Sequence, residues 1–216
     1  KESPIGVLSS QDRDLFADAY AQLIRDGNAA SLRRIESAVL ALCLDDTSPA
    51  SRTDVARGLW HGDGRNRYYD KSIQFIVYEN GKAGVLCEHS MMDGMPVMEM
   101  VDYVITRLHD RNIDMGVSQS SPSSLKMPEQ IRFVTSRKTL DAIAVAEAAF
   151  DKLVKAHEVS VRALFGYGSE QINQFKCSPD AFVQMAIQLA YKKMFDETAA
   201  TYEPTQVRTF LHGRTE

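Results

Sequence analysis

A histidine, an acid and a glycine are closely spaced near the middle of the chain. An apolar run that begins at Val85 leads to His89, and Asp93 and Gly94 follow four and five residues later. Imidazole exchanges protons near neutral pH, so His89 is a candidate general base. A carboxylate at the fourth position could orient the ring and fix its tautomer. A single histidine at a strand end is more often a hydrogen-bonded structural residue, so the spacing leaves both interpretations open.

The flanking residues predict the elements that would hold His89 at an open edge. Residues 72–78 and 83–88 are rich in strand-forming side chains, and they flank Asn80-Gly81, a strong hairpin signal. After residue 96, apolar side chains recur at helical spacing through residue 108. The sequence therefore predicts a hairpin whose second strand ends at His89, followed by a helix.

Hydrophobic periodicity predicts further elements on both sides of this hairpin. Helices are expected over residues 9–24, with Ser9 and Asp12 as a capping start, and over residues 32–45 and 140–154, and strands over residues 131–135 and 159–165. Ser178-Pro179-Asp180 is a typical helix start, with a capping hydroxyl, a proline in the first turn and an acid near the positive end of the dipole. This mixture of helices and strands predicts an α/β protein.

Composition narrows the class of protein. The 216 residues are 44% hydrophobic and 25% charged, as in an ordinary soluble globular protein. The formal charge of −4 gives no reason to expect a nucleic-acid partner. No apolar run is long enough for a membrane span, so we expect no transmembrane segment.

The cysteines argue against a disulfide framework and against structural zinc. They are three in number, far apart, and form no CxxC pair. Two histidine–aspartate pairs could in principle converge on a metal, but their spacing matches no known metal frame. These pairs are His61 with Asp63 and His89 with Asp93. We therefore expect no bound metal.

A change in composition predicts a domain boundary. Residues 116–128 contain five serines and two prolines, which is typical of a connector. The chain also begins without methionine and without a signal-peptide core, and we expect an internal segment of a longer protein.

Several motifs, in the same order along the chain, resemble the carnitine/choline acyltransferase family, with carnitine acetyltransferases as its most similar members. They are residues 66–71, 77–84, 88–94, 178–184, 186–191, 201–203 and 213–216. Several motifs in register are far more specific than a single HxxxDG. The resemblance runs through nearly the whole chain.

The resemblance implies the chloramphenicol acetyltransferase-like α/β fold of coenzyme-A-dependent acyltransferases, in two domains with a tunnel between them. Residues 1–115 would be the end of the first domain and would carry the catalytic histidine. Residues 116–128 would be the linker, and residues 129–216 the start of the second domain, with the coenzyme A and carnitine motifs.

The resemblance also implies reversible transfer of an acetyl group between coenzyme A and the carnitine hydroxyl. His89 matches the family's catalytic base and Asp93 the acid that supports it, whereas Glu88 is expected to be structural. An imidazole can accept and later return the proton that such a transfer moves. The alternatives are choline as acceptor, medium or long acyl chains, and a catalytically silent acyl-coenzyme A binder.

The residues that match the coenzyme A site are Asn173, Lys176, Ser178 and Asp180. A helix N-terminus beside Lys176 would suit a phosphate-bearing ligand. The family often has lysines where this chain has Ser169 and Asn173. Each lost exposed phosphate contact should cost on the order of 1 kcal/mol or less.

Tyr202 and Thr215 match the family's carnitine site. Choline acetyltransferases have an aliphatic residue at the position of Thr215, and an unpaired buried hydroxyl costs roughly 1–3 kcal/mol, so this threonine favours carnitine. Pro204 replaces a serine of the family. The family's oxyanion-stabilising Ser-Thr-Ser stretch and carboxylate-binding arginine would follow Glu216. Their loss costs roughly 10²–10³-fold in rate, so we expect the isolated chain to be inactive.

The partners implied are therefore small molecules: carnitine, and acetyl-coenzyme A as a co-substrate. We expect a monomer without a metal. The resemblance places such an enzyme in mitochondria or peroxisomes.

Overall fold

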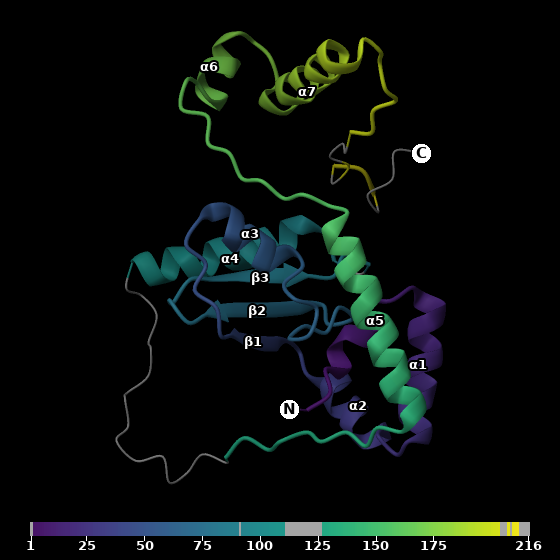
Figure 1. Ribbon diagram of the computed structural model, residues 1–216. Coiled ribbons are helices and arrows are strands. Elements are labelled where there is room, and N and C mark those ends of the chain that lie inside the picture. The colour runs from purple at the N-terminus through teal and green to yellow at the C-terminus, as the bar shows by residue number, and fades with distance from the viewer. Residues whose placement is uncertain (1, 91, 111–126, 204–206, 208, 212–216) are drawn as a thin grey trace. The chain divides into compact units, whose positions relative to one another are not determined.

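The computed structural model describes residues 2–90, 92–110, 127–203, 207 and 209–211 (Figure 1). These residues divide into two compact units, with the division between Val161 and Arg162. The first unit contains η1 (Ile5–Ser10), α1 (Arg13–Arg25), α2 (Ala29–Ser37), β1 (Ala41–Asp45), α3 (Arg52–Trp60), β2 (Ile73–Tyr78), β3 (Ala83–Cys87), α4 (Gly94–His109) and α5 (Arg137–Lys155). The second contains α6 (Ser169–Gln174) and α7 (Pro179–Phe195). The mixed α/β class is confirmed.

The three strands form one sheet in the order β1-β2-β3. β1 runs parallel to β2, and β2 runs antiparallel to β3, with Phe75 opposite Val85. Gly81 closes the hairpin at φ +79°, a conformation that glycine adopts without steric cost, and its N–H donates to the Tyr78 carbonyl over 2.9 Å. The predicted hairpin that leads to His89 is confirmed.

The helix α3 packs against one face of this sheet. Cys43, Ile76 and Tyr78 are buried there, with Val55 and Leu59 of α3 packed against them. Residues of β2 alternate between buried and half-buried, as expected for a strand with one face in a core. This small core supports the strand that ends next to His89.

A larger core lies among η1, α1, α2 and α5. It contains the fully buried Val7, Leu8, Leu23 and Ala146, together with Phe150. Figure 1 shows α5 alongside α1 and η1, so α5 packs within the first unit. Of the predicted linker, only residues 127 and 128 are described, and the predicted division of domains stays a prediction.

The predicted helix over residues 32–45 is wrong in its second half. α2 ends at Ser37, and residues 41–45 form β1 instead. Leu42 and Leu44 are exposed on one face of this strand and Cys43 is buried on the other. The alternation with period two, supported by pairing with β2, prevails over the helical spacing of the leucines.

The strands predicted over residues 131–135 and 159–165 are also absent from the described chain. A side chain takes the place of a neighbouring strand: the Asn28 amide donates to the Val134 carbonyl and accepts from the Val134 N–H, both over 2.7 Å. Similarly, Val161 N–H donates to the Thr53 hydroxyl. Backbone groups satisfied by side chains need no strand partner.

Removing the Asn28 side chain is therefore expected to destabilise the first unit. Asn28→Ala leaves both backbone groups of Val134 without their partner and should lower the free energy of unfolding by about 2 kcal/mol. Urea denaturation followed by circular dichroism measures the loss. Asn80→Ala is the matched control, because Asn80 is exposed, donates to the Pro49 carbonyl and accepts the N–H of Lys82, only two residues away. Equal stability of the two variants would contradict this role of Asn28.

Among the described helices, none has both the length and the apolar character that a membrane crossing requires.

Candidate active site

His89 lies just after the end of β3, and Asp93 is the residue immediately before α4. The hairpin bonding continues to the residue before His89, because the Glu88 N–H donates to the Ser72 carbonyl over 3.1 Å. Asp93 stands at the N-cap of α4 in an extended conformation, yet its carboxylate makes no capping hydrogen bond. A strand end and a helix start thus present both side chains on one turn.

The imidazole and the carboxylate face each other across this turn. His89 Nδ1 lies 3.8 Å from Asp93 Oδ1, and the two side chains are 78% and 89% exposed. The distance exceeds a hydrogen bond. Because the acid faces Nδ1, the arrangement leaves Nε2 as the nitrogen suited to exchange a proton with a substrate.

A small pocket of about 230 Å³ adjoins the imidazole. Its apolar lining comes from the end of β3 and the first turns of α4, and it includes Val85, Cys87, Val97 and Met98. Burial raises the pKa of the Cys87 thiol, which keeps it protonated and unreactive. An apolar hollow beside a candidate base suits the apolar part of a small substrate.

The carboxylate of Glu88 closes the turn on the other side of His89. It accepts the Ser90 N–H over 2.9 Å and the Ser90 hydroxyl over 2.6 Å. These hydrogen bonds, the hydroxyl first, hold the pKa of Glu88 below its ordinary value. Ser90 was not among the predicted site residues, although a hydroxyl two residues after an acid is a visible signal for such a turn.

The residues predicted for coenzyme A lie close together in the sequence of the second unit. Asn173 belongs to α6, and Lys176 follows it at φ +58°. Ser178 caps α7, since its hydroxyl accepts the Ala181 N–H over 3.4 Å, and Asp180 lies in the first turn. All four predicted side chains are exposed, and the predicted capped start of α7 is confirmed.

The two residues predicted for carnitine differ in what the structure describes. Tyr202 lies in the second unit, where its side chain is 88% exposed. Thr215 lies outside the described residues. The roles of both stay predictions.

His61 and Asp63 bind backbone groups of their own loop. His61 Nδ1 lies 2.6 Å from the Gly62 carbonyl, and the Asp63 carboxylate accepts the N–H groups of Arg65 and Asn66. In the part of the chain that the structure describes, no group of three potential ligands is arranged to hold a metal ion.

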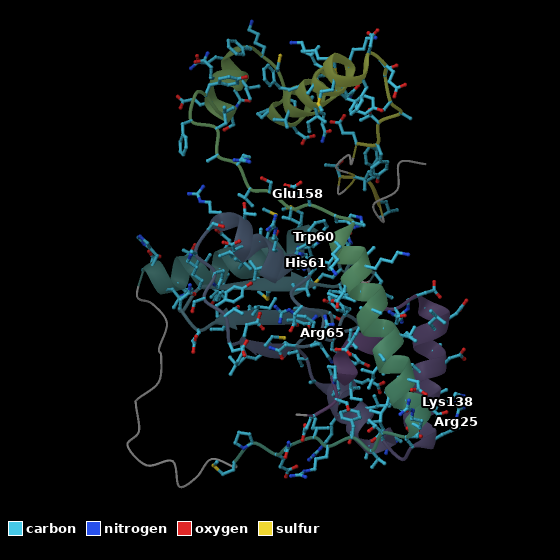
Figure 2. The ribbon with its side chains drawn as sticks, viewed as in Figure 1. Arg25, Trp60, His61, Arg65, Lys138 and Glu158 are labelled. Carbon is cyan, nitrogen blue, oxygen red and sulfur yellow. The ribbon has the colours of Figure 1, made fainter. Side chains whose placement is uncertain are left out.

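The motif at residues 66–71 anchors the sheet to its surroundings. Arg67 is 3% exposed and pairs with Asp45 at the end of β1. Lys71 is also buried, and its ammonium donates to three carbonyls at the end of α2. Just before the motif, Arg65, labelled in Figure 2, binds two acids of α5, with its Asp151 contact at 2.7 Å. These cations give this stretch a structural role, because they hold together the elements that support the hairpin.

Comparison with known proteins shows which family the sequence matches. The family model described as choline/carnitine O-acyltransferase matches residues 1–216. The chain is 38% identical to mitochondrial carnitine O-acetyltransferase of Saccharomyces cerevisiae, over 98% of the chain and 32% of that relative. It is 35% identical to choline O-acetyltransferase of Mus musculus, over 98% of the chain and 34% of the relative.

A third relative has a different acyl group in its name. The chain is 35% identical to mitochondrial carnitine O-palmitoyltransferase 2 of Xenopus tropicalis, over 100% of the chain and 33% of that protein. The chain thus spans about a third of the length of these relatives. With a family model that matches all 216 residues, the chain belongs to the choline/carnitine O-acyltransferase family.

Proposed function

We propose that the protein containing this chain transfers an acetyl group reversibly between coenzyme A and the hydroxyl of carnitine. The observation that carries the proposal is His89, exposed at the end of β3 with Asp93 facing its Nδ1 atom, in a chain of an acyltransferase family. Acyl transfer between a thiol and a hydroxyl needs one group that takes and returns a proton, and this histidine suits that task.

The proposed reaction moves one proton through the imidazole. Nε2 of His89 takes the proton of the carnitine hydroxyl as its oxygen attacks the thioester carbonyl. The thioester bond then breaks, and the leaving thiolate receives the proton from the imidazolium. Asp93 favours the tautomer with the proton on Nδ1 and stabilises the charged ring that forms. The reverse direction uses the same steps with the thiol as the first proton donor.

The proposed binding residues follow the family resemblance. Asn173, Lys176, Ser178 and Asp180 would contact coenzyme A, where the positive N-terminal end of α7 and the ammonium of Lys176 would both attract phosphate. Tyr202 and Thr215 would contact carnitine. The fold proposed for the whole protein is the chloramphenicol acetyltransferase-like one, with residues 116–128 between its two domains.

The proposal also specifies carnitine as the acceptor and acetyl as the transferred group. The hydroxyl of Thr215 favours a substrate with a carboxylate, and the yeast relative at 38% identity is a carnitine O-acetyltransferase. A second candidate, choline as acceptor, is favoured by the mouse relative at 35% identity. The enzyme would act as a monomer in mitochondria or peroxisomes.

A substrate comparison tests this proposal. The complete protein is assayed with acetyl-, octanoyl- and palmitoyl-coenzyme A, each with carnitine or choline, by release of the free thiol. We expect the highest kcat/KM for acetyl-coenzyme A with carnitine. A higher kcat/KM with choline would assign choline as the acceptor, and a higher kcat/KM with palmitoyl-coenzyme A would assign a long acyl chain. Tight binding of acetyl-coenzyme A without transfer to either alcohol would identify a silent binder and reject the enzyme.

A further inference from the structure

The turn that carries His89 is fixed on both sides by one residue, Glu88. Its backbone N–H is bonded to the Ser72 carbonyl at the start of β2. Its two carboxylate oxygens are bonded to the N–H and to the hydroxyl of Ser90, over 2.9 and 2.6 Å. His89 is the single residue between them. The bonded pair Glu88–Ser90, called the Glu88 clamp below, therefore restrains the backbone that presents the imidazole.

Little else in the described part of the chain holds this histidine in place. The side chain of His89 is 78% exposed, so packing does not restrict it, and Asp93 stays beyond hydrogen-bond distance at 3.8 Å. Asp93 itself makes no capping bond to α4. The distance between the ring and its acid thus depends on the conformation of the turn, and the Glu88 clamp restrains this turn on the side of His89.

We infer that Glu88 is a positioning residue for His89 and acts through its two hydrogen bonds to Ser90. The inference rests on the proposed function, in which His89 is the base. A base that is misplaced by about 1 Å can cost a large factor in rate, up to about 10²-fold, without loss of substrate binding. A charged acceptor is well suited to the clamp, because hydrogen bonds to a carboxylate are shorter and stronger than those to a neutral oxygen.

The test compares variants of the complete protein in acetyl transfer to carnitine. Glu88→Ala removes both bonds of the clamp, and we expect kcat to fall about 10-fold with little change in either KM. Ser90→Ala removes one bond and should lower kcat less, whereas Ser90→Thr keeps a hydroxyl and should restore it. The double variant should be no slower than Glu88→Ala alone, because the two residues act as a unit.

Ser37→Ala is the matched control. Ser37 is also exposed and its hydroxyl donates to the Arg34 carbonyl at the end of α2, within hydrogen-bond distance at 3.2 Å. This variant should keep wild-type kcat and KM. A role of Glu88 in folding alone would lower the melting temperature and the yield of active protein, but would not lower the kcat of the folded enzyme.

A second measurement needs no activity. The ¹⁵N order parameter of His89 should be lower in Glu88→Ala than in wild type, and Ser90→Thr should keep the wild-type value. An unchanged order parameter would overturn the inference whatever the enzyme does. If Glu88→Ala fails to fold, equal kcat values and order parameters in Ser90→Ala and Ser90→Thr would also overturn it.

The outcomes separate the two proposals. An inactive wild type, or full activity of a His89→Ala variant, rejects the proposed function, and the order parameter alone then decides on the clamp. An active wild type that needs His89 but gives wild-type kcat with Glu88→Ala rejects the clamp and leaves the proposed function standing.

Discussion

His89→Ala in the complete protein is expected to lower kcat for acetyl transfer to carnitine by about 10²–10⁴-fold, the usual contribution of a positioned general base. The methyl group of alanine cannot take the proton from the attacking hydroxyl or return one to the departing thiolate. The fold should be unaffected, because the side chain is 78% exposed and no core depends on it. Steady-state kinetics and a melting curve measure the two effects.

His109→Ala is the control for this substitution. His109 is 89% exposed near the end of α4, and its Nδ1 lies 3.6 Å from an aspartate, Asp110, much as His89 lies near Asp93. The two histidines therefore have similar surroundings, but only His89 follows the hairpin strand and adjoins the apolar pocket. Comparable losses of kcat in both variants would contradict the role of His89, because the effect would then not be specific to this histidine.

The support of His89 could be predicted because its signals are local. Asn80-Gly81 between two strand-forming runs specifies a hairpin, and the helical spacing after residue 96 specifies α4. Ser178 and Pro179 marked the start of α7 in the same way. Each of these signals acts within a few residues, so the sequence alone contains enough information to define the element.

β1 could not be predicted because its signal is distant. Leu32, Ile35, Val39 and Leu42 happen to follow helical spacing, and the pairing that makes residues 41–45 a strand comes from β2, where Cys43 lies opposite Ile76. The segment near Val134 was instead predicted as a strand and does not form one. Its residues favour a strand, but Asn28 satisfies its backbone from 106 residues away. In both places tertiary contacts prevail over local pattern.

In the candidate site, too, only the residues with a local signal could be predicted from spacing. The pair His89 and Asp93 was visible because the two residues are four positions apart in one turn. The residues expected to bind coenzyme A and carnitine came from resemblance alone, since no local rule of spacing connects Tyr202 or Lys176 to a histidine so far away in the chain. The buried Arg67 was seen only as part of a motif, because its partner Asp45 is 22 residues away.

Arg67→Met is expected to lower the free energy of unfolding by about 3–5 kcal/mol, as is usual when one partner of a buried ion pair is removed. Arg67 bonds both oxygens of Asp45, over 2.8 and 2.7 Å, and also donates to the Gly58 carbonyl over 2.8 Å. One guanidinium thus joins the end of β1 to α3. Methionine fills most of the volume but leaves the Asp45 carboxylate largely buried without its counter-ion.

The pair should also give stability a dependence on pH. Burial works to raise the pKa of Asp45, but hydrogen bonds from Arg67 and Asn66 outweigh it, so the pKa in the folded chain lies below its ordinary value. A carboxyl of this kind contributes stability above its unfolded pKa of about 4, and the contribution is lost as the pH falls through the folded pKa. The difference between wild type and Arg67→Met should therefore shrink below about pH 4.

Arg13→Met is the control, because Arg13 makes a similar two-bond contact to Asp70 at the surface, where its side chain is 69% exposed. Such a pair contributes about 1 kcal/mol or less, so urea denaturation at neutral pH should separate the two variants clearly. Replacing both partners, in Arg67→Met with Asp45→Leu, should recover much of the loss, since no buried charge is then left alone. If the single and double variants are equally unstable, the loss comes from packing and from the Gly58 contact, and the ion pair is not what stabilises this side of the sheet.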